Sequence, residues 1–222
     1  MLAVIAAMDE EIKLIKTAAK NKKEYCVCGI DCFTCTLENT EAVVLKSGIG
    51  KVSAASAAAV AIAVFKADEV INTGLAAGVY GFGTVMLADK VVQYDFDMRA
   101  DGYELGRNPD FESAYFECDA ALTARLKASL KKNGTKFVTA SIASGDAFVA
   151  DKAKMDFICS AFKVGGVEME SAAVGQVCTR AAVPFAILRA VSDGGDNVAD
   201  FYTFMKDACK NFTDAVLNFC KS

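Results

Sequence analysis

The sequence of 222 residues contains no histidine and no tryptophan, and it has only two prolines. Without histidine, the usual side chain that exchanges a proton near neutral pH is missing, which excludes a serine–histidine–aspartate triad. Carboxylates are therefore the leading candidates for any proton transfer. The scarcity of proline and the lack of serine- or glycine-rich stretches leave no sign of a linker, so we expect a single domain spanning 1–222.

The chain also lacks a surplus of positive charge and a long apolar run. Its formal net charge is -4, with lysine and arginine scattered among the acids, so nothing resembles a nucleic-acid-binding stripe. The longest apolar run, 52–65, is shorter than the roughly 20 residues that cross a bilayer. The amino terminus lacks the pattern of a signal peptide. We therefore expect a cytoplasmic protein that binds neither nucleic acid nor membrane.

Nine cysteines are many for such a protein, and the odd number argues against a complete disulfide framework. Four of them, Cys26, Cys28, Cys32 and Cys35, have the spacing C-x-C-x3-C-x2-C, which can be interpreted as a metal site. The segment is also typical of two strands around a turn at 29–31, which would send the last two thiols to opposite faces. The second interpretation is favoured, and no metal or cofactor is expected.

The order of apolar segments predicts strands interleaved with helices, and hence a three-layer α/β/α domain around a central mixed sheet. Strands are expected at 2–6, 23–28, 32–37, 42–45, 69–72, 89–95, 135–143 and 184–193. The strand at 69–72 is expected to lead into a glycine-rich bend at 74–78. Helices are expected at 9–20, 51–65, 120–132, 153–161, 171–182 and 200–220.

The glycine-containing segment 46–51, Lys-Ser-Gly-Ile-Gly-Lys, invites comparison with nucleotide-binding loops. The phosphate-loop pattern requires a glycine where Leu45 stands and a serine or threonine where Val52 stands. The dinucleotide fingerprint requires a third glycine where Ser53 stands. The segment therefore predicts only a glycine turn that opens a helix and whose backbone can approach a ligand.

Three acids stand out because their neighbours are apolar or small. Asp193 closes the apolar strand 184–193, Glu11 follows the first buried strand, and Glu170 stands at the expected start of a helix. Each has an ordinary interpretation as a helix-terminal charge or cap. Together they can gather around one cleft at the carboxyl ends of strands, which is where open α/β sheets bind ligands. An acid, a base and a hydroxyl-binding group suit cleavage of a glycosidic bond.

Five segments, covering nearly the whole chain, resemble the bacterial methylthioadenosine/S-adenosylhomocysteine nucleosidases of the nucleoside phosphorylase superfamily. They occur in the family's order and spacing, and they are 5–11 (IAAMDEE), 46–52 (KSGIGKV), 71–74 (INTG), 144–149 (SGDAFV), and 167–170 (VEME) with 189–193 (RAVSD). The resemblance implies a nucleoside phosphorylase-like fold. It also implies hydrolysis of the N-glycosidic bond of methylthioadenosine and S-adenosylhomocysteine to adenine and the 5′-thioribose.

The resemblance implies a role for each acid. Asp193 would be the general acid that protonates purine N7, Glu11 would activate the attacking water, and Glu170 would hold the ribose hydroxyls. Further residues are implied in binding the purine and ribose, namely Ala77, Phe148, Val149, Met169 and Ser192. Others are implied in an apolar pocket for the 5′-thio substituent, namely Met8, Ile49, Met98, Tyr103 and Phe201. The family also implies a homodimer, for which the alanine-rich helix at 52–65 is the interface candidate.

The chain departs from the family pattern at 72–78, where Asn-Thr-Gly-Leu-Ala-Ala-Gly replaces the usual Asn-Thr-Gly-Ser-Ala-Gly-Gly. Leu75 removes a hydroxyl close to the place where phosphorylases of the superfamily bind phosphate, and the acidic segment 8–11 would repel that anion, so water is the expected nucleophile. Two alternatives stay open. One is a related purine nucleosidase or phosphorylase with another purine substrate, of which futalosine is the first candidate, and the other is a non-catalytic nucleoside-binding protein.

Overall fold

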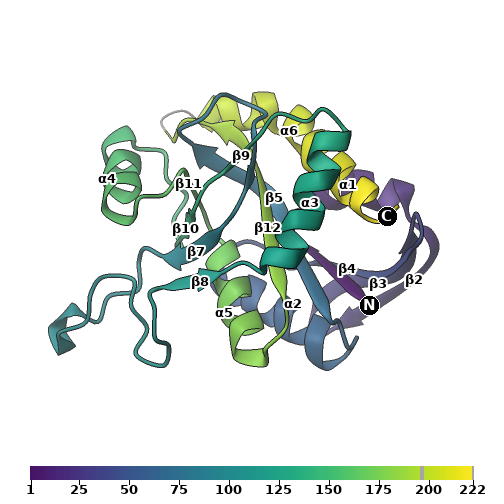
Figure 1. The fold of residues 1–222 in the computed structure, drawn as a ribbon, viewed down its shortest axis with the longest axis horizontal. Helices are drawn as coiled ribbons and strands as arrows, with labels where there is room; N and C mark the ends of the chain where they lie inside the picture. Colours follow the sequence, from purple (N-terminus) through teal and green to yellow (C-terminus); the bar gives the residue numbers. More distant parts are fainter. Residues whose placement is uncertain (196–197, 222) are drawn as a thin grey trace.

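The computed structural model describes residues 1–195 and 198–221, and for 198–201 and 204 it describes the backbone alone. The described part contains six α-helices, which are α1 (Asp9–Ala18), α2 (Lys51–Ala63), α3 (Ala120–Lys132), α4 (Lys152–Phe162), α5 (Ser171–Ala181) and α6 (Val198–Phe219). Its strands are β1 (Leu2–Ala6), β2 (Lys20–Val27), β3 (Ile30–Leu37), β4 (Thr40–Lys46), β5 (Glu69–Gly78), β6 (Val85–Leu87), β7 (Lys90–Gln93), β8 (Tyr115–Glu117), β9 (Phe137–Thr139), β10 (Ile142–Ser144), β11 (Gly166–Glu168) and β12 (Phe185–Asp193). Figure 1 shows the helices on both sides of the strands.

The strands form one mixed sheet, with the order β2-β3-β4-β1-β5-β11-β10-β7-β8. At its centre β5 pairs in parallel with both β1 and β12, and β12 carries β6 and β9 on its other edge. Antiparallel pairs join β2 to β3, β3 to β4, and β7 to β8. The expected α/β/α arrangement with a mixed sheet is therefore confirmed, including the antiparallel portion built from the early strands.

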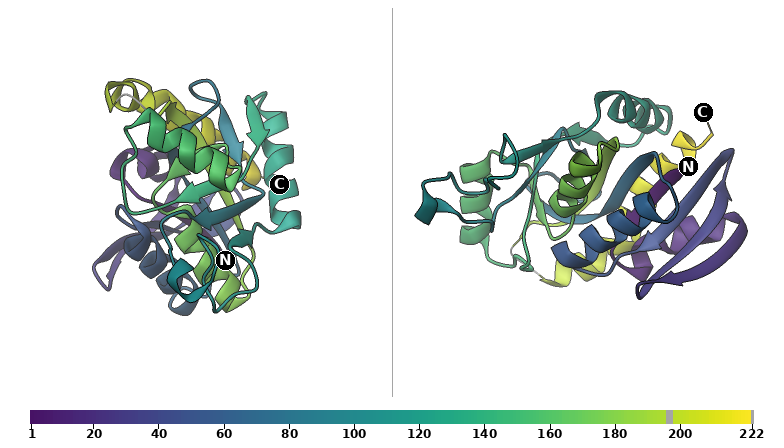
Figure 2. Two further views of the ribbon diagram at one scale, coloured as in Figure 1. Left: turned by 90° about the vertical axis from the view of Figure 1, so that its left-hand side faces the viewer. Right: turned by 90° about the horizontal axis from the view of Figure 1, so that it is seen from below.

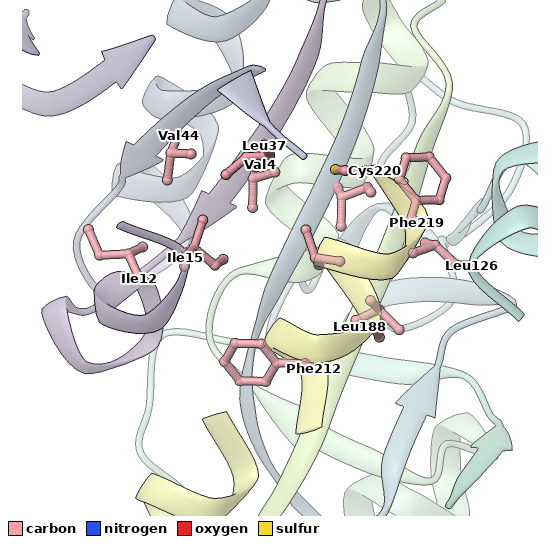
Figure 3. Packing of buried hydrophobic residues seen from close by; sticks show 14 of the residues in the cluster. Val4, Ile12, Ile15, Leu37, Val44, Leu126, Leu188, Phe212, Phe219 and Cys220 are labelled. Carbon is pink, nitrogen blue, oxygen red and sulfur yellow. The ribbon is translucent and has the colours of Figure 1, made fainter. Parts of the chain in front are cut away.

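Strand β1 shows why the sheet has helices on both faces. All five of its residues are buried, and successive side chains point to opposite faces. Leu2, Val4 and Ala6 pack against α1 and α6 in one hydrophobic cluster, whereas Ala3 and Ile5 pack on the side of α2 and α5 in another. Figure 3 shows the first of these clusters. A strand without polar residues is stable only where both faces are covered.

The alanine-rich helix α2 lies close to its neighbours because its inward side chains are small. Ala54, Ala57, Ala58 and Ala61 are fully buried, and the helix packs against α5, β1 and β4. The opposite face of α2 is exposed and consists of small or branched side chains, namely Val52, Ser56, Ala59 and Ala63. The amino-terminal end of α2 lies beside Glu170, because Gly50 N, just before the helix, donates a hydrogen bond to the Glu170 carboxylate.

The segment 95–113 extends away from the sheet (Figure 1). Figure 2 shows this segment together with α4 at one end of the molecule, far from β2, β3 and β4 at the other end. It contains one 3-10 turn, Arg99–Asp101, and no α-helix or strand among its residues, all of which the structure describes. Met98 and Tyr103, which were expected to contribute to a binding pocket, both lie on this segment.

The structure corrects several expected boundaries. The glycine-rich bend predicted at 74–78 is wrong, because β5 continues to Gly78 without a break. Small residues in this stretch allow side chains from neighbouring elements to approach the strand, a tertiary effect that a turn-forming composition does not reveal. The single strand expected at 135–143 is two short strands, β9 and β10. The three-residue strands β6, β8 and β11 were not predicted, because a segment of three residues is too short to show a periodic pattern.

The cysteine cluster forms part of the β2–β3 hairpin. Cys32 and Cys35 are buried in different hydrophobic clusters on opposite faces of the sheet, as the strand interpretation predicts, and Cys26 and Cys28 are exposed. Within the described residues, no three acidic, thiol or imidazole side chains are placed to share a metal ion. The same part of the chain contains no helix long and apolar enough to span a membrane.

Candidate active site

A pocket of about 390 Å³ opens at the carboxyl ends of β1, β12 and β11, beside the last residues of β5. It is lined by most of the residues that sequence analysis selected, namely Met8, Glu11, Ile49, Ala77, Phe148, Val149, Met169, Glu170, Ser192 and Asp193. The lining also includes residues that were not selected, among them Glu10, Leu75, Glu168, Tyr202 and Met205. Glu11 precedes Glu170 by 159 residues in the sequence and Asp193 by more. The three catalytic candidates nevertheless line one cavity.

Glu11 lies in the first turn of α1 and is almost fully buried. Its Oε2 accepts hydrogen bonds from the backbone N–H groups of Ala7 and Met8, at 2.8 and 3.0 Å. Its Oε1 accepts a third from Leu75 N on β5, at 2.9 Å. Burial raises the pKa of this carboxyl, and Arg189 together with the three N–H donors opposes that rise. Glu11 is therefore a fixed acceptor whose proton affinity exceeds that of an exposed glutamate.

Asp193 owes its direction to an irregularity at the end of β12. The pairing with β5 runs from Phe185 to Val191 and then shifts, so that Ser192 is an extra residue before Asp193 pairs with Ala77. Such a bulge re-aims the side chains that follow it. The Asp193 carboxylate accepts hydrogen bonds from Ser192 Oγ at 2.8 Å and from Gly195 N at 2.9 Å. Ser192 thus lines the pocket and also holds the acid in place.

The loop after β10 forms one wall of the pocket with Phe148 and Val149. Phe148 is about half exposed, whereas Val149 is buried. The loop is tied to the start of α2, because Asp146 Oδ1 accepts from Lys51 N at 2.8 Å. An aromatic ring beside a buried aliphatic side chain provides a flat apolar slot that suits a planar base.

Glu170 is the residue that precedes α5, and it is 5% exposed. Its Oε1 accepts from Gly50 N at 2.9 Å, and its Oε2 lies 3.5 Å from Nη2 of Arg189. Burial, followed by the charge of Glu168, raises the pKa of Glu170 to about 8, against the opposing effect of Arg189. A carboxyl with such a pKa is mostly protonated at neutral pH, so it can donate as well as accept a hydrogen bond.

Arg189 is the central cation of the site, and sequence analysis did not select it. It is 1% exposed on β12, with Nη2 2.5 Å from Glu168 and 2.7 Å from Asn72 Oδ1. Its Nε donates to Ser171 Oγ at 3.0 Å. An arginine inside an otherwise apolar strand is itself a signal, because a buried charge requires buried partners.

Gly74 explains how the cation and Glu11 can lie so close to β5. A Cβ atom at this position would lie 2.2 Å from Arg189 Nη1 and 2.6 Å from Glu11 Oε1. No side chain other than hydrogen fits in that space. The glycine that suggested a bend is therefore needed where charged groups of two other elements cross the strand.

Two parts of the pocket differ in character. We call the four lining acids Glu11, Glu168, Glu170 and Asp193, together with Arg189 that pairs with two of them from behind, the floor; all five are at most 7% exposed. The apolar side chains that line the opening are the mouth, namely Met8, Ile49, Tyr202 and Met205. Ile49 and Tyr202 are 58% and 69% exposed, so the mouth is open to solvent.

Three of the expected 5′-pocket residues are not part of this cavity as described. Met98 and Tyr103 do not line it, because the segment 95–113 that carries them extends away from it. The side chain of Phe201 lies outside the described residues. On the same helix, Tyr202 and Met205 do line the pocket. The spacing of Phe201 and Met205, one helical turn apart, is a signal that could have identified Met205.

The phosphorylase superfamily model matches residues 1–221. A methylthioadenosine/S-adenosylhomocysteine nucleosidase of Geobacillus sp. (strain WCH70) is 37% identical, covering 100% of this chain and 98% of that relative. The enzyme of the same name from Bacillus subtilis (strain 168) is 34% identical over 99% of this chain and 98% of its own length. This chain belongs to the methylthioadenosine/S-adenosylhomocysteine nucleosidase family of the phosphorylase superfamily. It is accordingly an enzyme of a family of N-glycosidases.

Solved structures agree with this membership of the nucleosidase family. The enzyme of Neisseria meningitidis, solved in complex with methylthio-immucillin-A, superimposes with a TM-score of 0.96 at 36% identity, covering 99% of this chain and 98% of that one. The futalosine hydrolase of Helicobacter pylori strain 26695 superimposes with a TM-score of 0.93 at 28% identity, covering 98% and 96%. The nucleoside phosphorylase-like fold is therefore confirmed, and one fold accommodates enzymes named for different nucleosides.

Proposed function

We propose that this protein hydrolyses the N-glycosidic bond of 5′-methylthioadenosine and S-adenosylhomocysteine, and that it releases adenine and the 5′-thioribose. The observation that carries the proposal is the common pocket of Glu11, Glu170 and Asp193, beside the slot made by Phe148 and Val149. The names of the relatives and the inhibitor in the Neisseria meningitidis complex support the same substrates. A nucleoside that extends from the slot toward Glu11 would direct its 5′ substituent to the mouth.

Departure of the purine requires a proton, because the electrons of the broken C1′–N9 bond pass to the base. Asp193 delivers that proton to N7, and its other oxygen accepts from the exocyclic amine. The hydrogen bonds from Ser192 Oγ and Gly195 N support this role, because they fix the carboxyl in one orientation. Protonation before bond cleavage makes adenine a neutral leaving group.

The ribose then carries positive charge shared between C1′ and the ring oxygen, as in other glycoside cleavages. Water adds to C1′, and Glu11 takes one of its protons. Three N–H donors hold Glu11 in place, and its raised pKa suits a base at neutral pH. Glu170 and the backbone of Met169 bind the ribose hydroxyls, which keeps C1′ facing the water.

Water is the proposed nucleophile, and phosphate is not. The floor holds four acidic side chains and a single guanidinium that already pairs with Glu168, which disfavours the binding of phosphate. Leu75 and Ala77, where the family usually has serine and glycine, line the pocket with apolar atoms, and Leu75 lies close to Glu11. Leu75 lies on the water side of the pocket, so its substitution affects the attack step, whereas Ala77 pairs with Asp193 on the purine side.

Release of free base decides between the candidate functions. Purified protein is given methylthioadenosine, S-adenosylhomocysteine, inosine and futalosine, each with and without phosphate, and the free base is quantified. We expect adenine from the first two substrates at a rate independent of phosphate. Turnover of futalosine alone would select the second candidate function, which the Helicobacter pylori futalosine hydrolase supports. Phosphate-dependent turnover would contradict hydrolysis, and no turnover would favour a nucleoside-binding protein.

We also propose a homodimer that uses the exposed face of α2, where Val52 is 78% exposed beside a row of small side chains. A partner copy would also reconcile the proposed 5′-pocket roles of Met98 and Tyr103 with their place outside the pocket of their own chain. Light scattering coupled to gel filtration measures the mass in solution. We expect a dimer, which Val52→Arg converts to monomer, and a monomeric parent protein would contradict the proposal.

A further inference from the structure

Glu168 is a floor carboxylate to which the proposed reaction assigns no role. It stands at the carboxyl end of β11, with a side chain that is 3% exposed. Its Oε2 accepts from Glu170 N at 2.9 Å and from Ser171 N at 2.9 Å. Its Oε1 accepts from the Ser144 hydroxyl, which in turn accepts from Ala172 N at 2.8 Å. The N–H groups at the start of α5 that no helical carbonyl satisfies, those of Glu170, Ser171 and Ala172, thus donate to Glu168 or Ser144.

The same carboxylate fixes Arg189. Nη2 of Arg189 lies 2.5 Å from Glu168 Oε2 but 3.5 Å from Glu170 Oε2, so the guanidinium pairs more closely with Glu168. Ser171 and Asn72 hold the rest of the guanidinium edge, at 3.0 and 2.7 Å. The two oxygens of a carboxylate have about four acceptor positions. With these donors, Glu168 has no position left for a substrate hydroxyl.

We propose that Glu168 is a positioning residue, which orients Glu170 by capping α5 and holds Arg189 away from Glu170. The proposal rests on the proposed nucleosidase function, because it gives Glu168 its effect through the ribose-binding Glu170. It explains why two glutamates separated by one residue are both buried in one pocket. One organises the site and the other contacts the substrate.

The charges around Glu170 support this division of roles. Facing it are Glu168 from β11, Glu11 from α1 and Arg189 from β12, together with the N–H group of Gly50 before α2. The two glutamates raise the pKa of Glu170, and Arg189 and Gly50 N lower it. Glu168 therefore acts twice, once by its own negative charge and once by drawing the guanidinium to itself. Both effects favour a protonated Glu170.

Glu168→Gln removes the negative charge of residue 168 but keeps the size of its side chain, so it tests the two charge effects without changing the packing. With the charge gone, Arg189 is free to approach Glu170, so the pKa of Glu170 falls by about 1–3 units. The measurement is a carbon-13 NMR titration of the glutamate carboxyls, with the Glu170 signal assigned through Glu170→Gln. This readout needs no turnover, so it succeeds or fails independently of the proposed reaction. An unchanged titration in folded Glu168→Gln would overturn the proposal.

Two further variants test positioning by kinetics. Glu168→Asp keeps the charge but is one methylene shorter, so Glu170 retains its raised pKa while kcat on methylthioadenosine falls by about 10²-fold through misplacement. Ser144→Ala is the control for charge, because it removes a neutral donor to Glu168 and an acceptor for Ala172 N but leaves the ion pair with Arg189 intact. It should leave the pH profile of kcat/KM unchanged. Wild-type kcat in Glu168→Asp would overturn the positioning role.

Discussion

The floor and the mouth of the pocket are built on opposite principles. The floor consists of five charged residues that are at most 7% exposed, and hydrogen bonds from the backbone or from one another fix them. The mouth consists of apolar side chains, and two of them are more than half exposed. Because a buried charge without partners is costly, every floor residue depends on its neighbours. An exposed apolar side chain has no such constraint.

In the proposed reaction, this difference separates chemistry from substrate choice. Groups that transfer protons or bind the ribose must hold one geometry, because small misplacements cost large factors in rate. Contacts with a variable 5′ substituent contribute by area and tolerate substitution. Enzymes named for different nucleosides share this fold, as the Helicobacter pylori futalosine hydrolase shows. We therefore expect floor variants to change kcat strongly and mouth variants to change mainly KM.

The largest effect is expected for Asp193→Asn, which keeps the shape of the side chain but cannot supply the proton. The rate of adenine release should fall by about 10²–10⁴-fold, the usual contribution of a general acid. The measurement is kcat for methylthioadenosine, with circular dichroism and thermal unfolding to establish that the fold is intact. A wild-type kcat in this variant would remove Asp193 from the mechanism.

Gly74→Ala tests whether the floor tolerates any movement. The new Cβ would lie 2.2 Å from Arg189 Nη1, so the guanidinium and Glu11 must shift. We expect kcat to fall by about 10²-fold and the free energy of unfolding to fall by about 1–3 kcal/mol. Gly81→Ala is the control, since its Cβ would meet only the end of Lys136 at 3.9 Å. Equal effects of the two variants would show that the floor is not specially constrained.

The floor should also make stability depend on pH. The pKa of Glu170 is about 8 in the folded protein, against 4.5 as its ordinary value, so between these values the folded state binds more protons than the unfolded state. Its contribution to stability is therefore full below about pH 4.5 and is lost as the pH rises to about 8.

Urea unfolding at several pH values measures this contribution as the difference between the parent protein and Glu170→Gln. The difference should change in favour of the variant as the pH rises, by at most about 1.4 kcal/mol per pH unit. A difference that does not vary between pH 5 and pH 8 would contradict a raised pKa of Glu170.

The smallest effect is expected at the mouth. Ile49→Ala removes a side chain that is 58% exposed in the open pocket, so its loss costs little stability. We expect KM for methylthioadenosine to rise about fivefold, equivalent to about 1 kcal/mol, with kcat unchanged. Initial rates over a range of substrate concentrations separate the two constants. A large fall in kcat would show that the mouth also positions the reacting atoms.

Sequence patterns were most informative where residues act through local periodicity. The buried strand β1, the helices α1 and α6, and the three catalytic candidates at element ends were all predicted, and the structure brings Glu11, Glu170 and Asp193 to one pocket. The patterns were least informative where residues act through distant partners. Gly74 suggested a bend, although its role is to make room for Arg189 and Glu11.

The sequence by itself determined the fold class and, by resemblance, the family and its three acids, because apolar periodicity and motif order are local properties of the chain. Only the tertiary structure decided which residues organise those acids. The bulge at Ser192 sets β12 against β5, the Glu168 carboxylate on β11 pairs with Arg189 on β12, and Glu11 on α1 accepts from Leu75 N on β5, so each joins elements far apart in the sequence. Hydrogen bonds and charge pairs depend on distances in space, and spacing along a chain does not specify those distances until the sheet has formed.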